Sequence, residues 1–85
     1  MIATEALGEV RRQAGLGRVQ FSGHARDRMR ERGATKNDVV SALANGTSCK
    51  AAEGGKWKVT GPDIDGDDLT AVVAIEDDVV VVTVF

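Results

Sequence analysis

The end of the chain carries two runs rich in β-branched residues, and these constrain the fold more than any other feature. Residues 69–75 read LTAVVAI and residues 79–85 read VVVVTVF, with only EDD between them. β-Branched side chains favour extended strands, and a link this short and polar is typical of a turn between neighbouring strands. The two runs therefore predict a β-hairpin.

Upstream of the hairpin, polar and apolar residues alternate over residues 56–60 (KWKVT). On a strand this alternation places Trp57 and Val59 on one face and Lys58 on the other. Residues 47–53, followed by the turn residues Gly54-Gly55, favour one more strand. The second half of the chain thus predicts an antiparallel sheet of three to four strands.

The first half of the chain has a helical period instead. Apolar residues recur at helical spacing over residues 1–16, which predicts an N-terminal helix. Ser22 and Gly33 are residues that commonly begin and end a helix, and they bound a second one. Thr35 begins a third helix with a capping-box pattern, and this helix ends at Asn45-Gly46.

These elements predict one α+β domain over residues 1–85, with two to three N-terminal helices packed on one side of the sheet. We expect residues 16–20 to be a linker. The last run, VVVVTVF, is apolar on both faces of its strand, so something should cover the second face. Either a partner chain covers it, as in a homodimer, or the chain's own helices and the loop over residues 61–68 wrap both sides.

Charge is distributed unevenly along the chain. The formal net charge is -2, yet residues 11–36 hold seven arginines and one lysine against two acids. The stretch HARDRMRERG, residues 24–33, contains the single histidine and four of these arginines. Such a balance argues against general coating of nucleic acid but is compatible with a local site for anions.

On a helix, the four-residue spacing places His24, Arg28 and Arg32 along one flank of the apolar side formed by Ala25 and Met29. Arg26 and Arg30 fall on the opposite flank. Guanidinium groups suit phosphate oxygens, and a helix N-terminus adds exposed N–H groups with partial positive charge. The same charges disfavour protonation of His24, so we expect a neutral imidazole that can accept a proton. The plainer alternative is a solvated helix in which Arg28 pairs with a neighbouring acid.

Other chemistry is poorly supported by the sequence. A single cysteine, Cys49, excludes an internal disulfide, and with one histidine it cannot form a zinc site without carboxylates. The acidic segment PDIDGDD, residues 62–68, lacks the glycine and glutamate positions of a calcium loop and predicts a turn. We expect no metal and no cofactor. Without an apolar run long enough to span a bilayer, and with acids where a secretory signal has basic residues, we expect a cytoplasmic protein.

The segment FSGHARDRMRERGATKNDVVSALANG, followed by WKVTG, DGDDLTAVVAI and VVVVTVF, resembles domain-of-unknown-function family 4258 over residues 21–85. The most specific part is His24, Arg28, Met29 and the pair Arg32-Gly33; the helix over residues 1–16 lies outside it. Such proteins are similar to RelE-like and MqsR-like toxins of type II toxin–antitoxin systems. The resemblance implies a RelE-like fold, cleavage of messenger RNA without a metal, and an antitoxin partner of the zinc-finger and helix-turn-helix type. Ala34 replaces the isoleucine usual after Arg-Gly.

This resemblance and the charge pattern suggest one mechanism. His24 would take the proton of a 2′-hydroxyl, Arg28 and Arg32 would hold the scissile phosphate, and Lys58 or an arginine would assist the leaving group. The RNA backbone would be bound by further arginines: Arg26, Arg30 and Arg18, with Arg11 and Arg12. The alternative function is a non-catalytic interaction module whose basic helix binds an acidic partner protein or nucleic acid.

Overall fold

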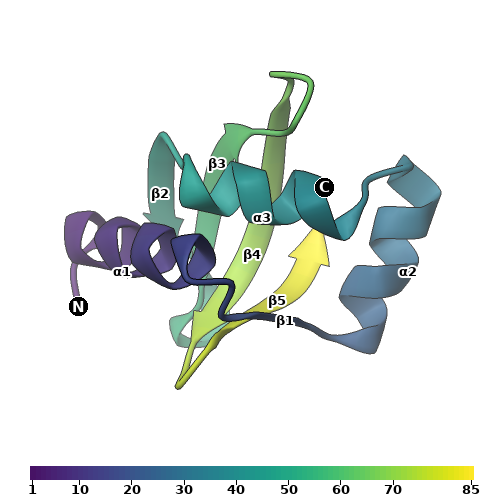
Figure 1. The fold of residues 1–85 in the computed structure, drawn as a ribbon. Coiled ribbons are helices and arrows are strands. Elements are labelled where there is room, and N and C mark those ends of the chain that lie inside the picture. The colour runs from purple at the N-terminus through teal and green to yellow at the C-terminus, as the bar shows by residue number, and fades with distance from the viewer.

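A computed structural model describes residues 1–85 and has the expected α+β class (Figure 1). The helices and strands follow one another as α1 (Ala3–Gly15), β1 (Val19–Phe21), α2 (Gly23–Arg32), α3 (Lys36–Ala44), β2 (Ser48–Ala51), a 3₁₀ turn (Glu53–Gly55), β3 (Trp57–Pro62), β4 (Asp68–Ile75) and β5 (Val79–Val84). They form one five-stranded sheet in the order β1-β5-β4-β3-β2. No helix is long and apolar enough to cross a membrane.

The sheet is larger than the three- to four-stranded antiparallel sheet expected from the sequence, because β1 joins it as a parallel neighbour of β5. All other strand pairs are antiparallel. Local pattern could not reveal β1, since it spans three residues and pairs with the far end of the chain. Residues 19 and 20 therefore belong to a strand and not, as expected, to a linker. The backbone N–H of Val79 bonds the Arg18 carbonyl at 3.0 Å, and the N–H of Ser22 bonds the Val81 carbonyl at 3.0 Å.

The helix ends follow the predicted capping residues. Ser22 accepts a hydrogen bond from the Ala25 N–H at 3.0 Å and begins α2, which ends at Gly33 in the left-handed conformation with φ of 70°. Thr35 and Asp38 form the reciprocal capping box of α3. The cap at Ser22 and the left-handed Gly33 explain why the arginine-rich segment forms a helix that begins and ends at these residues.

Helices α1 and α3 lie on one side of the sheet and form the core with it (Figure 1). The core joins apolar side chains from both helices to alternate residues of the central strands. Its largest fully buried members are Val10, Val39, Leu43, Val59, Val73, Val79, Val81 and Val84. A β-bulge between β4 and β5 lets Val81 and Val84 both face this core although they are three positions apart. Helix α1 thus belongs to the same core as the region that carries the family resemblance.

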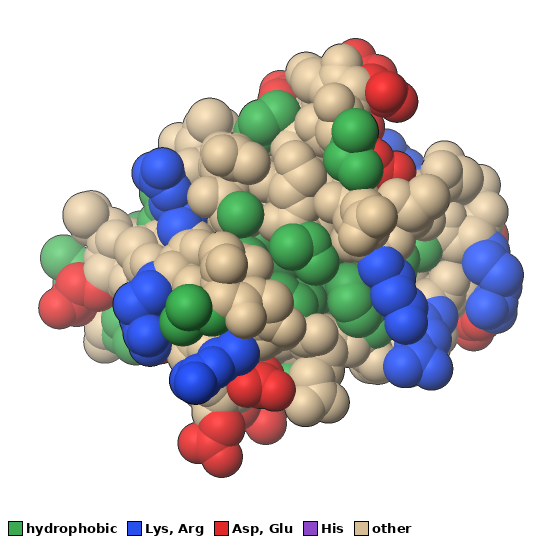
Figure 2. All heavy atoms as spheres, viewed as in Figure 1, with side chains coloured by type: hydrophobic (Ala, Val, Ile, Leu, Met, Phe, Trp, Pro, Cys, Tyr) green, Lys and Arg blue, Asp and Glu red, His purple; other side chains and the backbone are tan.

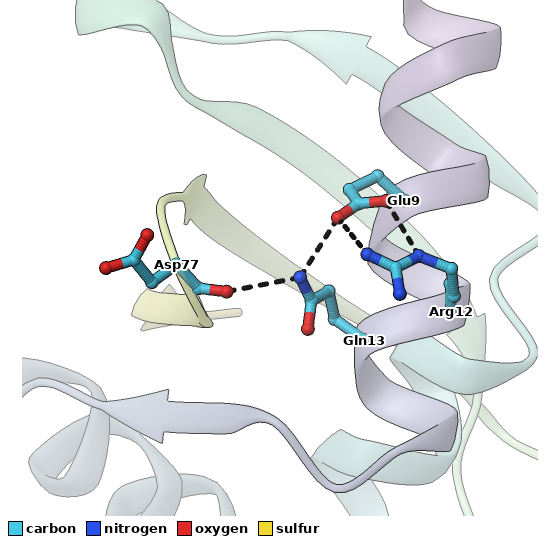
Figure 3. A network of polar contacts seen from close by, with 4 residues as sticks. All are labelled: Glu9, Arg12, Gln13 and Asp77. Carbon is cyan, nitrogen blue, oxygen red and sulfur yellow. Dashed lines mark hydrogen bonds and ion pairs between the residues drawn. The ribbon is translucent and has the colours of Figure 1, made fainter.

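Gln13 fixes α1 to the turn between β4 and β5 (Figure 3). Its amide nitrogen donates to the Glu9 carboxylate at 2.9 Å and to the Asp77 carbonyl at 3.1 Å, and the residue is 4% exposed. Arg12 donates two hydrogen bonds to the same carboxylate at 2.8 and 3.0 Å, which lower the pKa of Glu9. Arg12 is therefore engaged within α1.

The second face of the sheet retains partly exposed apolar residues. Val72, Ala74 and Val80 are only half-buried, whereas Val73 and Val81, which alternate with them, are fully buried on the helical side. Helix α2 stands beside the end of β5, and α1 and α3 both lie on the opposite face (Figure 1). The chain's own helices therefore do not cover this apolar face. That a second chain covers it stays a prediction.

Candidate functional site

Helix α2 holds both sets of arginines that the sequence analysis distinguished. Ala25 and Met29 are buried in the core, so the helix presents the same side inward that the periodicity predicted. His24 and Arg32 are exposed, and Arg28 between them is half-buried. The buried pair therefore separates His24, Arg28 and Arg32 on one flank from Arg26 and Arg30 on the other.

Arg28 binds the end of β5. Its Nε donates to the Val84 carbonyl at 3.3 Å, and its guanidinium forms an ion pair with Glu31 at 3.3 Å. The side chain is still 38% exposed, and neither contact uses its second terminal nitrogen. Arg28 thus pairs with a neighbouring acid, as in the plainer alternative drawn from the sequence, yet part of its guanidinium remains accessible.

Lys58 approaches the same end of β5 from β3. Its side chain is exposed, and Nζ lies 5.0 Å from the centroid of the Phe85 ring, a cation–π contact. Phe85 continues the pairing with β4, since its N–H bonds the Thr70 carbonyl at 2.9 Å. Arg28 and Lys58 therefore contact successive residues of the chain, Val84 and Phe85, while His24 and Arg32 lie one helical turn to either side of Arg28.

The hollowed surface lies on the other flank of α2. A groove of about 390 Å³ is lined by Val19, Gln20, Phe21, Arg26, Lys36 and Asp78. A second hollow of about 250 Å³ is lined by Arg26, Met29, Arg30, Ala34 and Lys36. The two share Arg26 and Lys36, and Lys and Arg side chains gather around α2 in Figure 2. His24, Arg28, Arg32 and Lys58 line neither hollow.

Among the residues of this groove the sequence predicted only Arg26 as a site residue, and it missed Lys36, Phe21, Val19, Gln20 and Asp78. The Lys36 Nζ lies 5.8 Å from the Phe21 ring centroid. Lys36 begins α3 directly after the Thr35 cap, so its position on the helix was predictable. Its proximity to Phe21 was not, because that depends on the pairing of β1 with β5.

The remaining arginines expected to bind RNA differ in their exposure and in their partners. Arg30 pairs with Asp27 on the exposed surface of α2. Arg18 is exposed at the start of β1, and Arg11 is exposed on α1. Arg12 is held by Glu9, as described above. Arg26 and Arg30 are thus the two that line a hollow together.

The surroundings of Cys49 and of the acidic segment over residues 62–68 point to structural roles. Partial burial raises the pKa of the Cys49 thiol, which opposes formation of the nucleophilic thiolate. Asp63 accepts hydrogen bonds from the N–H groups of Asp65 and Asp67 at 2.9 Å each, which gives the predicted turn. No group of three or more His, Cys, Asp and Glu side chains is arranged to hold a metal ion.

Comparison with known proteins agrees with the resemblance seen in the sequence. A search of curated proteins found no match. The family model described as Domain of unknown function (DUF4258) matches residues 21–85, which is most of the chain and includes α2, α3 and all strands from β2 to β5. The match omits α1, although α1 contributes Ala6, Val10 and Ala14 to the buried residues. The chain belongs to the DUF4258 family.

Proposed function

We propose that the protein is a toxin-like endoribonuclease that cleaves messenger RNA by 2′-hydroxyl attack without a metal ion. The observation that carries the proposal is the flank of α2 on which His24 is exposed in the first turn, with Arg28 and Arg32 following at intervals of one turn. The resemblance of the sequence to RelE-like and MqsR-like toxins supports the same reaction class.

His24 acts as the general base in this scheme. Its imidazole takes the proton from the 2′-hydroxyl, whose oxygen forms a bond to phosphorus while the bond from phosphorus to the 5′-oxygen breaks. The leaving 5′-oxygen receives a proton from Lys58 or from one of the two arginines. The products are a 2′,3′-cyclic phosphate and a free 5′-hydroxyl.

Arg28 and Arg32 stabilise the charge that develops on the non-bridging phosphate oxygens. A guanidinium can donate two parallel hydrogen bonds to such oxygens. The contact of Arg28 with the Val84 carbonyl fixes the approach of its side chain, which favours a preorganised donor. Arg26, Arg30 and Arg18 bind the flanking RNA backbone, so affinity should fall steeply as salt is raised.

The proposal includes a bacterial cytoplasmic location and an antitoxin partner of the zinc-finger and helix-turn-helix type, as the resemblance implies. In this scheme one chain supplies all four proposed catalytic residues: His24, Arg28, Arg32 and Lys58.

The test is induced expression in a bacterial host, with growth arrest and RNA breakdown scored for the parent and for His24→Ala. Loss of a positioned base should slow cleavage by about 10² to 10⁴-fold. Thr4→Ala is the control, since this exposed side chain on α1 lies outside both the proposed catalytic set and the proposed RNA-binding set. Purified His24→Ala must keep the parent's circular dichroism spectrum. Cleavage of RNA by His24→Ala at the parent's rate would refute the assignment.

One observation favours the alternative of a non-catalytic interaction module. The hollows on the surface lie beside Arg26, Arg30 and Lys36 and not beside His24. For a binding module, His24→Ala would leave function intact, whereas charge reversal of Arg28 and Arg32 would abolish it. His24→Ala therefore separates the two functions, because it abolishes the nuclease and leaves the binding module intact.

A further inference from the structure

Strand β1 has one edge that no other part of the chain pairs with. In a parallel ladder alternate residues point their backbone groups at the neighbouring strand, and here Arg18 and Ser22 bond to β5. Gln20, midway between them, shares this direction. Val19 and Phe21 must then point their N–H and C=O groups outward, and β1 is the last strand of the sheet.

The groove of about 390 Å³ runs along this free edge, since Val19, Gln20 and Phe21 all line it. Its walls differ in charge. Lys36, which lies over the Phe21 ring, and Arg26 belong to the side of α2 and α3. Asp78 lies on the other side, where it accepts a hydrogen bond from Gln20 at 2.9 Å.

We propose that this groove binds an extended acidic segment of a partner protein, which adds to the sheet as a strand beside β1. The outward N–H and C=O groups of Val19 and Phe21 offer two donors and two acceptors to an incoming backbone. Side chains of a strand alternate between two faces, so every second residue of the segment lies against Arg26 and Lys36. Carboxylates at those positions complement the two cations.

A peptide fits these groups better than RNA does. RNA phosphates present acceptors only and leave the outward carbonyls of Val19 and Phe21 to ribose 2′-hydroxyls or bases, whereas a peptide backbone alternates the donors and acceptors that a strand edge requires. A peptide can keep its carboxylates on the side of Arg26 and Lys36, away from Asp78, whereas every nucleotide of RNA carries a phosphate; the neighbouring hollow is also partly apolar through Met29 and Ala34.

The binding does not depend on nuclease activity. Because Arg26 is also a side chain proposed to hold the RNA backbone, a bound segment would compete with RNA on this flank. Peptide binding is therefore measured without RNA, and His24→Ala should bind the peptide as the parent does. Failure of the nuclease proposal then leaves this result unchanged.

The experiment is selection of a randomised phage-displayed peptide library on the immobilised protein, followed by affinity measurement of a synthetic selected peptide. We expect selected sequences with Asp or Glu at every second position. The double variant Arg26→Glu/Lys36→Glu should lose more than about tenfold in affinity, since it replaces two charge-assisted contacts with repulsion. Lys50→Glu/Lys56→Glu makes the same charge change outside both hollows and outside the proposed catalytic and RNA-binding residues, and it should keep the parent's affinity.

Amide hydrogen exchange tests strand addition directly. The bound peptide should slow exchange at Val19 and Phe21, while Gln20 keeps its rate. The proposal is overturned if the library yields no acidic sequences, if affinity is insensitive to Arg26→Glu/Lys36→Glu, or if Val19 and Phe21 exchange unchanged. It is also overturned, in favour of RNA, if a single-stranded oligonucleotide protects these amides and no peptide does.

Discussion

Gly61 lies where β3 passes close to α3, and replacing it with alanine tests how these elements pack. A Cβ atom at Gly61 would lie 2.0 Å from the Ala42 carbonyl oxygen and 2.9 Å from the Gly46 Cα. Carbon–oxygen contacts in proteins begin at about 3.3 Å, so α3 would have to move away by roughly 1 Å. Both obstructing groups are backbone, which leaves no flexible side chain to yield.

Overpacking of a well-packed core costs about 1 to 3 kcal/mol. Because the obstacle at Gly61 is the backbone of α3, we expect Gly61→Ala to cost about 3 kcal/mol. A domain of this size loses roughly 4 to 8 °C in melting temperature per kcal/mol, so Tm should fall by about 12 to 24 °C. The measurement is thermal unfolding followed by circular dichroism.

Gly8→Ala is the matched control. Gly8 lies inside α1, and a Cβ there would meet nothing within 4 Å. Alanine is favoured over glycine in a helix by about 0.5 to 1 kcal/mol, so Gly8→Ala should raise Tm by a few degrees. A Gly61→Ala protein that melts within about 2 °C of the parent would refute the close approach of α3 to β3.

Three further outcomes follow from the described contacts. Ser22→Ala should cost about 1 kcal/mol or more in the free energy of unfolding, measured in urea, because Ser22 caps α2 and its hydroxyl also donates to the Val82 carbonyl at 2.9 Å. Hydrogen bonds from Thr35 lower the pKa of Asp38 below its ordinary 3.8, so its ionised form stabilises the fold above that pH and the contribution is lost as the pH falls further. The difference in Tm between the parent and Asp38→Asn should accordingly shrink on acidification below 3.8. Burial raises the pKa of Cys49, so its alkylation by iodoacetamide should reach half its maximal rate at a higher pH than that of a model thiol, and an unshifted profile would contradict this.

The elements encoded by local signals were predictable from the sequence. Ser22, Gly33 and Thr35 act within one helical turn of themselves, and the structure confirms the helix ends that they predict. The buried pair Ala25 and Met29 likewise confirms which side of α2 faces inward. Because the inward side of α2 was predictable, the placement of His24 and Arg26 on opposite flanks of the helix was predictable too.

Features that depend on distant pairing were not predictable. The three residues of β1 have no periodicity of their own, and only their contact with β5 makes them a strand. The same pairing brings Phe21 under Lys36 and creates the groove. The contact of Arg28 with Val84 was hidden for a similar reason, since it joins residues 56 positions apart. Sequence pattern identified which side chains carry charge, but not which of them surround a hollow.

The two flanks of α2 face different parts of the molecule. Arg28 binds the end of β5, whereas Arg26 forms a wall of the groove beside β1. Both positions depend on the same cap at Ser22 and the same buried contacts of Ala25 and Met29. A substitution that loosens α2 would therefore impair both flanks at once and could not separate catalysis from partner binding. Exchange of the exposed side chain of His24 keeps the helix in place and removes only the proposed base. Exchange of Arg26 weakens both the proposed RNA binding and the proposed partner binding, so His24→Ala is the variant that distinguishes the two roles.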